Sequence, residues 1–294
     1  MVKAIFTTRS DTTYKDVREE RYHFPNSYLR QAEQAIGDWI IYYEPRRGEG
    51  RQVYFATARV DRIVSDPEIV DHFYAYISDY LEFVTPVPFR EVNGFYETAL
   101  RGVDGAPNLG SFQRAVRIIP DHEYEAILRA GFGNVLSEKV DGSVPVAPGM
   151  SEVAIEFERP ILESIVRRPV RDEAFRKTIE TAYDATCAIT GLRIINGGGR
   201  AEIEAAHIKP VAGGHKGSDS VRNGIALSRT FHWLFDRGFL SLSDDYGILV
   251  AEKLVPTQAA RMINPDRQLL VPKQPHMRPH PIFVRYHREN LFKG

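Results

Sequence analysis

Three stretches that lie close together in the chain decide how its C-terminal part is expected to fold: AEIEAAHIKP at 201–210, RNGIALS at 222–228 and RTFHWLFDRG at 229–238. The first reads as a short strand closed by Pro210, since proline favours an extended residue before it. The second opens on the turn pair Asn223-Gly224 and continues as an apolar strand. The third has the length of a short helix that stops at Gly238. The order predicts a compact strand, strand, helix unit.

The polar residues of this unit suggest a metal site. His207 falls on the first predicted strand, Asn223 at the start of the second, and His232 on the helix. His232 and Asp236 are four residues apart, so they share a helix face and are predicted to be two ligands of one divalent cation. An imidazole with a carboxylate suits a first-row metal, or magnesium when water fills the remaining positions.

A cation beside a free imidazole is the minimal equipment for hydrolysis of a phosphodiester. In this interpretation His207 takes a proton from water while the cation neutralises the charge that develops on the phosphate. The amide of Asn223 would hold the loop that carries His207. Each residue alone also has an ordinary explanation: a buried histidine bonded to a carbonyl, an Asn-Gly turn, or an ion pair of Asp236 with Arg237. Their occurrence together in one strand, strand, helix unit favours a functional site.

The segment from about 170 to 250 resembles the HNH endonuclease family, in the branch that carries CAITG, EAAHIKP, NGIALS and HWLFDRG in this order. The resemblance implies a ββα-metal finger in which His207 is the general base, Asn223 the structural middle residue and His232 a metal ligand. It also implies a divalent metal cofactor, Mg²⁺ or Mn²⁺, with Co²⁺ and Ni²⁺ as further candidates.

The chain departs from the wider family at one position. Many members place an aspartate ligand directly before the base, where this chain has Ala206. We expect Asp236 to substitute for it because Asp236 shares the helix face of His232. Glu204 is the alternative, although on a regular strand its side chain lies on the face opposite His207. The single cysteine, Cys187, rules out a structural zinc site built from this chain's cysteines and is expected to be a small core residue.

Charge is distributed unevenly along the chain. The net charge is -1, but residues 167–294 hold 20 Lys and Arg against 13 Asp and Glu, while the remainder holds 18 against 26. The C-terminal part can therefore meet a polyanion. Four basic residues around the predicted unit are candidates for contacts with DNA phosphates, although each alone could be a plain surface charge: Lys209, Arg222, Arg229 and Arg237.

The N-terminal part contains the pattern GDWIIYYEPRRGEGRQVYFATARVDRI at 37–63, two aromatic and β-branched strands joined by a basic turn. Over about residues 1–135 it resembles the PUA superfamily, in particular EVE-like and SRA-like readers of modified bases. The resemblance implies a base flipped into an aromatic pocket. Candidate pocket residues are Tyr22, Phe24, Tyr28, Trp39, Tyr42, Tyr43 and Tyr54. Because strands alternate faces, Trp39 and Tyr43 point away from Tyr42, and the rings could equally form a barrel core.

Further elements are expected from local patterns. Residues 1–9 start as a strand, and 27–36 read as a helix or turn. Residues 66–84 carry a helical start signal, and 122–132 read as a short helix that Gly131 ends. Residues 172–191 begin as a helix with Phe175, Ile179 and Tyr183 at helical spacing. A last helix in 278–294 would dock on the finger or pair two subunits.

The expected fold class is α+β: an N-terminal PUA-like twisted β-barrel with flanking helices, joined to a C-terminal ββα-metal HNH nuclease domain. The length of 294 residues favours two domains, which we place at 1–165, including a linker from about 134, and at 166–294. No apolar run is long enough for a membrane helix and no signal peptide is visible, so we expect a cytoplasmic protein with no membrane partner.

Together these patterns predict a modification-dependent DNA endonuclease of restriction type. It would read a modified cytosine, such as 5-methylcytosine or 5-hydroxymethylcytosine, by base flipping and cut double-stranded DNA nearby. One finger holds one active site, so double-strand cleavage needs a homodimer or two independent nicks. The alternatives are a modified nucleic-acid binding protein that does not cleave, for which Ala206 is the supporting residue, and an RNA-directed nuclease.

Overall fold

The computed structural model describes residues 2–8, 15–46, 50–91, 94–102, 105–140 and 168–294. The chain divides into two compact units, Met1–Ala174 and Phe175–Gly294. The domain boundary predicted between residues 165 and 166 falls within 141–167, outside the described residues.

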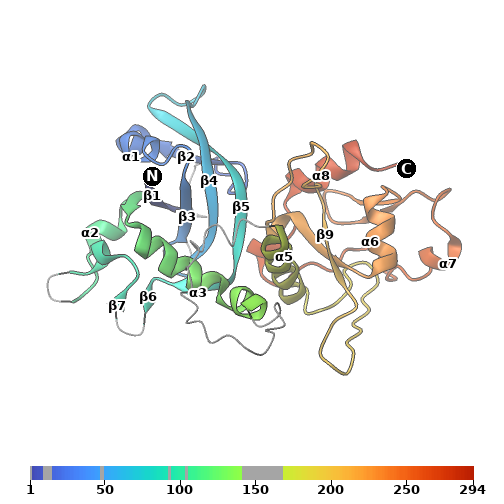
Figure 1. Ribbon diagram of the computed structural model, residues 1–294. Coiled ribbons are helices and arrows are strands. Elements are labelled where there is room, and N and C mark those ends of the chain that lie inside the picture. Colours follow the sequence, from blue (N-terminus) through green and yellow to red (C-terminus); the bar gives the residue numbers. More distant parts are fainter. Residues whose placement is uncertain (1, 9–14, 47–49, 92–93, 103–104, 141–167) are drawn as a thin grey trace, which may run out of the picture. The chain divides into compact units, whose positions relative to one another are not determined.

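The first unit is built on a six-stranded sheet with the order β2-β5-β4-β3-β1-β8. It curls like half of a barrel (Figure 1). Strands β1 and β3 are parallel, and every other neighbouring pair is antiparallel. The strands are β1 Lys3–Thr7, β2 Arg21–Pro25, β3 Trp39–Glu44, β4 Val53–Ser65, β5 His72–Pro88 and β8 Val116–Ile119.

The predicted aromatic hairpin is present as β3 and β4, and its alternation builds two cores. Ile40 and Tyr42 enter a cluster on one face of the sheet. Ile41 and Tyr43 enter the cluster on the other face, which also contains residues of a long helix, α3 Asp121–Val140. This alternation sends neighbouring aromatic rings of one strand to opposite sides of the sheet.

Residues 66–84 do not begin a helix, as their start signal suggested. The carboxylate of Asp66 instead accepts a hydrogen bond from the Glu68 amide (2.8 Å) in the turn that joins β4 and β5. The following run is rich in aromatic and β-branched residues, and it pairs with β2 on one side and β4 on the other as β5. Pairing on both sides satisfies its backbone, so tertiary context overrides the local signal.

Shorter elements complete the first unit. They are η1 Asn26–Tyr28, α1 Leu29–Glu33, β6 Arg90–Glu91, β7 Gly94–Phe95, η3 Thr98–Leu100, α2 Leu109–Phe112 and α3 Asp121–Val140. The prediction that Gly131 ends a helix was wrong, because α3 continues to Val140. A Cβ atom at Gly131 would lie 2.6 Å from the Phe83 ring, so this glycine lets α3 approach β5 closely.

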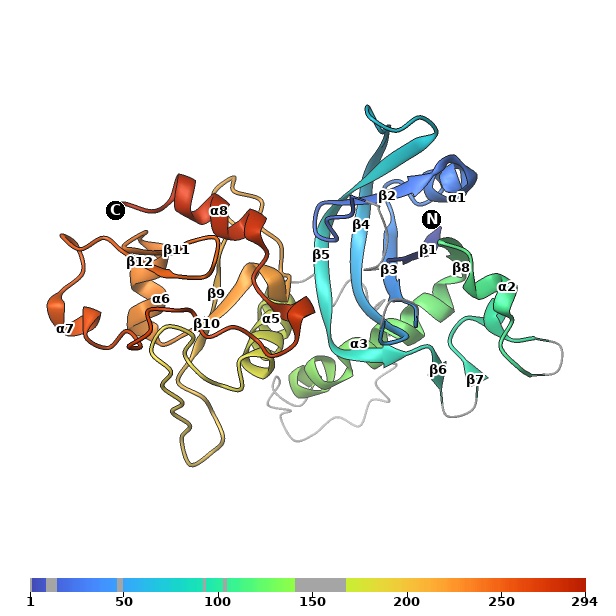
Figure 2. The same cartoon turned by 180° about the vertical axis from the view of Figure 1, so that it is seen from behind.

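The second unit contains the strand, strand, helix order that the sequence predicted (Figure 2). Its elements are β9 Glu204–His207, η4 Val221–Asn223, β10 Gly224–Leu227, α6 Arg229–Asp236, β11 Leu240–Leu242, β12 Ile248–Val250, α7 Thr257–Ala260, η5 Pro275–Met277 and α8 Pro281–Asn290. Helix α5, Arg168–Ala182, precedes them. Strands β9 and β10 are antiparallel, with Gly224 opposite His207. Gly238, after α6, has the left-handed φ of +69° typical of a helix stop.

A single core holds this unit together. Phe175, Ile179 and Tyr183 of α5 and the adjoining turn are buried in it, as is Cys187, in agreement with their sequence patterns. The chain's last helix packs on the same unit, because His287 stacks on Phe235 at 3.9 Å and lies 2.9 Å from the Ser241 hydroxyl. Burial lowers the pKa of His287 to about 4. The tail therefore docks on the finger of its own chain.

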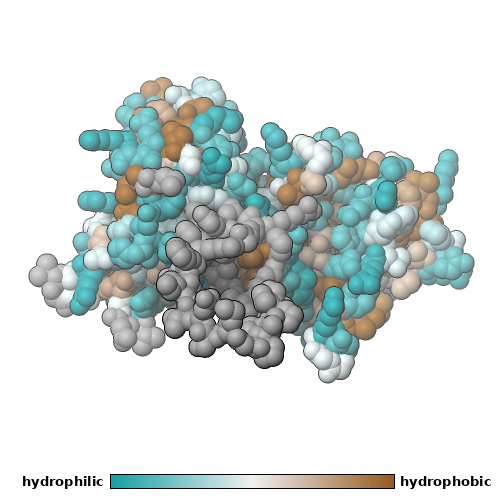
Figure 3. All heavy atoms as spheres, viewed as in Figure 1, coloured by the Kyte–Doolittle hydropathy of each residue, from teal (hydrophilic) through white to brown (hydrophobic). Residues whose placement is uncertain are grey.

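The surface is mixed in character. On the face shown in Figure 3, hydrophobic patches are interspersed with hydrophilic residues. Within the described residues, no helix combines the length and the apolar character that crossing a bilayer requires.

Gly131→Ala is predicted to destabilise the first unit by about 1–3 kcal/mol, because the new methyl group would overlap the Phe83 ring. Gly133→Ala is the matched control in the same helix, since a Cβ atom there meets nothing within 4 Å. It should stabilise by about 0.5–1 kcal/mol through helix propensity. Denaturant unfolding measures both changes, and equal stabilisation by the two alanines would contradict the packing role of Gly131.

Candidate active site and aromatic pocket

His207 is held at the end of β9 by two contacts. Its ring stacks on the Phe175 ring, with centroids 4.0 Å apart and planes 5° from parallel. Its Nε2 lies 2.9 Å from a carboxylate oxygen of Asp219, which is buried, while the His207 side chain is 26% exposed. When Nε2 carries the ring proton and donates it to Asp219, Nδ1 is the nitrogen that can accept a proton. The imidazole is thus fixed in orientation and still reached by solvent.

Asn223 is fully buried and joins the two ends of the loop between β9 and η4. Its Nδ2 donates to the carbonyl oxygens of Lys209 and Ser218, both at 2.9 Å. Its Oδ1 accepts from the Lys209 amide at 2.8 Å. The side chain therefore satisfies three backbone groups of the loop that begins after His207 and leads to Asp219.

His232 lies between two carboxylates. Its Nδ1 is 2.9 Å from Glu204 and its Nε2 is 3.3 Å from Asp236. The hydrogen bond to Asp236 raises the pKa of His232, and the bond to Glu204 adds to this effect against the opposing effect of burial. Asp236 lies beside His232 because the two residues are four apart on α6, and Glu204 reaches His232 from β9.

Glu204 is the residue of β9 that reaches His232. Residues two apart on a strand share a face, so Glu204 points to the same side as Ala206, which is buried in the core. This face of β9 therefore carries a carboxylate, that of Glu204, which contacts His232. Glu204 lies three positions before His207, which corresponds to about 10 Å along a strand.

The donor set fits a divalent cation held by few protein ligands. Among the described residues, no group of three or more His, Cys, Asp and Glu side chains is arranged to hold a metal ion. Magnesium commonly binds one or two carboxylates and completes its coordination with water and phosphate oxygens. One ring nitrogen of His232 and the carboxylate beside it would supply two protein ligands, either Nδ1 with Glu204 or Nε2 with Asp236. The carboxylate on the other nitrogen would then orient the ring.

The four basic residues predicted to contact DNA all lie in this unit. Lys209 directly follows Ile208 beyond β9, and its ammonium lies 4.9 Å from the Tyr286 ring centroid. Arg222 is in η4, beside Asn223. Arg229 opens α6 with its Nε donating to Glu204 at 3.0 Å, and Arg237 follows α6 with its guanidinium over Trp233.

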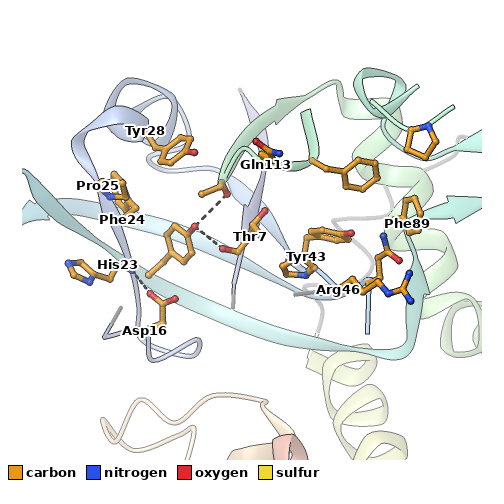
Figure 4. Close-up of a pocket in the computed structure, with 16 residues that line it drawn as sticks. Thr7, Asp16, His23, Phe24, Pro25, Tyr28, Tyr43, Arg46, Phe89 and Gln113 are labelled. Carbon is orange, nitrogen blue, oxygen red and sulfur yellow. Dashed lines mark hydrogen bonds between the residues drawn. The ribbon is translucent and has the colours of Figure 1, made fainter. Parts of the chain in front are cut away.

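The first unit contains a pocket of about 640 Å³, a size typical of ligand sites. Figure 4 shows it at the end of the sheet where β1 stops. Its aromatic lining consists of Tyr22, Phe24, Tyr28, Tyr43, Phe89 and Phe112. Its polar lining includes Thr7, Asp16, His23, Arg46, Gln52 and Gln113.

Four of the seven rings proposed from the sequence line this pocket: Tyr22, Phe24, Tyr28 and Tyr43. Trp39, Tyr42 and Tyr54 are not among its lining residues. Tyr42 is fully buried in the core cluster on the Ile40 side of the sheet. Tyr54 is also buried, and its hydroxyl donates to Glu97 at 2.6 Å. The alternation of residues along one strand predicts the face of the sheet on which each ring lies, but not which rings from different strands meet at the end of the sheet.

Asp16 is a pocket residue that sequence reasoning missed. One of its oxygens accepts a hydrogen bond from the His23 amide at 2.6 Å (Figure 4). Burial raises the pKa of this carboxyl to about 6. The group can therefore accept hydrogen bonds near neutral pH and donate one when protonated. Asp16 precedes β2 with no pattern around it, so no local signal marked it.

Sequence comparison agrees with the geometry of the second unit. The family described as HNH endonuclease matches residues 187–243, which span His207, Asn223 and His232. Residues 187–243 form an HNH endonuclease domain. The match leaves the first unit unassigned, and no curated protein matches the chain.

Three solved structures illustrate a distant likeness to this chain. The modification-dependent TagI restriction endonuclease has 14% identity and a TM-score of 0.33, covering 97% of this chain and 81% of that one. A protein from Agrobacterium tumefaciens has 14% identity and a TM-score of 0.31, covering 45% of this chain and 93% of that one. The phosphorothioation-dependent restriction endonuclease ScoMcrA has 13% identity and a TM-score of 0.20, covering 78% and 46%.

Asn223→Ala is predicted to loosen the loop of the HNH domain, because three buried backbone groups lose their partners. Amide exchange at Lys209 should accelerate about tenfold or more, since each 1.4 kcal/mol of lost protection is a factor of ten. Hydrogen exchange measured by NMR gives the rate. Asn196→Ala is the control, because Asn196 also accepts from backbone amides but does so in an exposed turn. Unchanged exchange at Lys209 would remove the loop-holding role.

Proposed function

We propose that this protein is a metal-dependent DNA endonuclease of restriction type that recognises a modified cytosine with its first unit and cuts nearby with its HNH domain. The observation that carries the nuclease proposal is the coincidence of the HNH match with a fixed, solvent-accessible imidazole. His207 has a partner for one ring nitrogen, a stacking ring behind it and a loop held by Asn223.

His207 would act as the general base. Its Nδ1 accepts a proton from the water that attacks the phosphorus, and the Asp219 carboxylate stabilises the imidazolium that results. Phe175 prevents the ring from rotating out of this orientation. Attack by water at phosphorus breaks the bond to the 3′ oxygen, and hydrolysis leaves 5′-phosphate and 3′-hydroxyl ends.

His232 with Asp236 would hold the divalent metal, Mg²⁺ or Mn²⁺, and Glu204 would orient the His232 ring. Such a cation supplies charge stabilisation to the phosphate and to the departing oxygen. Lys209, Arg222, Arg229 and Arg237 would contact phosphates of double-stranded DNA, which fixes the position of the duplex without reading its sequence.

The pocket of the first unit would receive the flipped base. Tyr22, Phe24, Tyr28 and Tyr43 offer faces on which a base can stack. A carboxylate is the side chain that pairs with the exocyclic amino group of cytosine, and Asp16 presents one among these rings. This combination of rings and one acidic group supports a cytosine derivative as the ligand.

One HNH domain per chain cuts one strand. Cleavage of both strands would therefore require a homodimer or two separate nicks, and symmetric dimers are the commonest solution. A binding protein that has lost cleavage is the second candidate, and Ala206 favours it. The presence of Glu204 on the face of Ala206 counts against it.

The nuclease proposal predicts cleavage of modified DNA that depends on His207. Identical duplexes carrying cytosine, 5-methylcytosine or 5-hydroxymethylcytosine are incubated with Mg²⁺ or Mn²⁺, and product is quantified on denaturing gels. Cutting is expected on modified duplexes, and His207→Ala should slow it about 10²- to 10⁴-fold, the usual contribution of a general base.

The Asp16→Asn variant tests base recognition separately from cleavage. Asp61→Asn is its control, because Asp61 is exposed. Loss of one base contact should weaken binding of modified DNA about tenfold in the first variant only. Equal cutting of all duplexes would remove the modified-base reader and keep the nuclease. Selective binding without any cutting would favour the non-cleaving protein, and preferential cutting of RNA would contradict the DNA assignment.

The metal assignment predicts that Asp236→Asn raises the Mn²⁺ concentration for half-maximal cleavage by at least about tenfold. Glu204→Gln tests the other side of His232, and Asp244→Asn is the control because that carboxylate pairs with Arg288 outside the site. Metal titrations of the cleavage rate give the comparison. If Asp236→Asn keeps full activity at low metal concentration, the metal would be assigned to Glu204 and Nδ1 of His232 instead.

A further inference from the structure

A row of two aromatic rings with a cation at each end lies on the surface of the second unit, starting on α6. Trp233 directly follows His232 and is 55% exposed. The Arg237 guanidinium lies over its ring at 5.7 Å. Phe239 meets the indole edge-on, with centroids 5.7 Å apart, and the Lys293 ammonium lies 5.5 Å from the Phe239 ring centroid. We call Arg237, Trp233, Phe239 and Lys293 the aromatic ladder.

The fold of α6 does not require Trp233. The helix is anchored by Phe231, Leu234 and Phe235, which are buried in the core of the unit. Trp233 stands on the other side, where more than half of its surface meets water. A large ring that is kept exposed and flanked by charges is typical of a surface that binds a partner.

The position and charge of the ladder indicate what that partner is. Trp233 is four residues from Arg229 and four from Arg237, so the three share one face of α6, and the neighbouring face carries His232 and Asp236. Arg237 and Lys293 add positive charge at the two ends of the ladder. Aromatic rings flanked by cations are an arrangement that binds the bases and phosphates of an unpaired strand.

We infer that the aromatic ladder stacks against a nucleobase that is displaced from the duplex beside the phosphodiester that the HNH domain cuts. This inference rests on the proposed nuclease function and adds a second base contact, remote in sequence from the pocket of the first unit. Stacking on Trp233 would use the π-face that every base has, so the contact is tolerant of sequence. Arg237 and Lys293 would contact the flanking phosphates.

The sequence supplies its own probe, because the chain has only two tryptophans, Trp39 and Trp233. In a His207→Ala, Trp39→Phe protein, Trp233 is the sole indole emitter and cleavage is suppressed. Duplex DNA is titrated while indole emission and the anisotropy of a labelled duplex are recorded. Stacking should quench the Trp233 emission, with the same midpoint DNA concentration as the rise in anisotropy. When an abasic nucleotide is moved stepwise along the duplex, the quench should be lost at one position.

Substitution gives an independent measure. Trp233→Ala should weaken DNA binding about 5- to 100-fold, the usual loss for one stacked base, whereas Trp233→Phe retains a ring and recovers part of the affinity. Met262→Ala is the matched control, since Met262 is 49% exposed in the same unit and lies outside the ladder.

The outcomes separate this inference from the nuclease proposal. DNA binding without a change in Trp233 emission, or unchanged affinity in Trp233→Ala, overturns the ladder and leaves the nuclease intact. Failure of the unsubstituted protein to bind or cut any nucleic acid overturns the proposed function itself. Loss of self-association in Trp233→Ala, with DNA affinity unchanged, would assign the ladder to a second copy of the chain and overturn the inference.

Discussion

The buried amide of Asn223 is the interaction on which the nuclease unit depends. A loop of about a dozen residues separates the two strands of the finger, and it contains a backbone hydrogen bond of its own, from the Gly217 amide to the Pro210 carbonyl at 2.9 Å. One side chain supplies three hydrogen bonds to it, at both of its ends. The result is that Asp219, carried on this loop, meets His207 at hydrogen-bonding distance. The geometry of the candidate site at His207 therefore follows from a buried polar group that holds the loop in place.

A second constraint shapes the surroundings of His232. The residue directly before His207 is Ala206, which is packed in the core. Strand periodicity makes residue 204 equivalent in direction, and Glu204 reaches His232 from there. Helical periodicity brings Asp236 to the other nitrogen of the same ring. The strand spacing of Glu204 and the helical spacing of Asp236 thus bring two carboxylates to the imidazole of His232.

Much of the second unit was predictable from the sequence because its signals are local. Pro210, the Asn223-Gly224 turn and Gly238 mark the ends of short elements, and apolar spacing placed Phe175 and Ile179 in the core. Asp219 and Glu204 were harder, since a loop conformation and a cross-element contact decide their partners. In the first unit, β5 was mistaken for a helix start because Asp66 stabilises a turn, and pairing on both edges then determines the strand. Asp16 was not predictable, since only the folded sheet brings it beside the pocket rings.

The packing of α8 has a consequence for how the protein is made. His287 contacts Phe235 and Ser241, and the Lys293 amide donates to the Gly238 carbonyl at 2.9 Å. A Cβ atom at Gly238 would lie 1.8 Å from the Leu291 carbonyl, so the end of α6 is shaped for this last segment. A ribosome that has synthesised the chain only to residue 280 has completed every candidate catalytic residue but not the packing behind them. The second unit can therefore reach its final fold only once α8 has been synthesised and has packed against the end of α6.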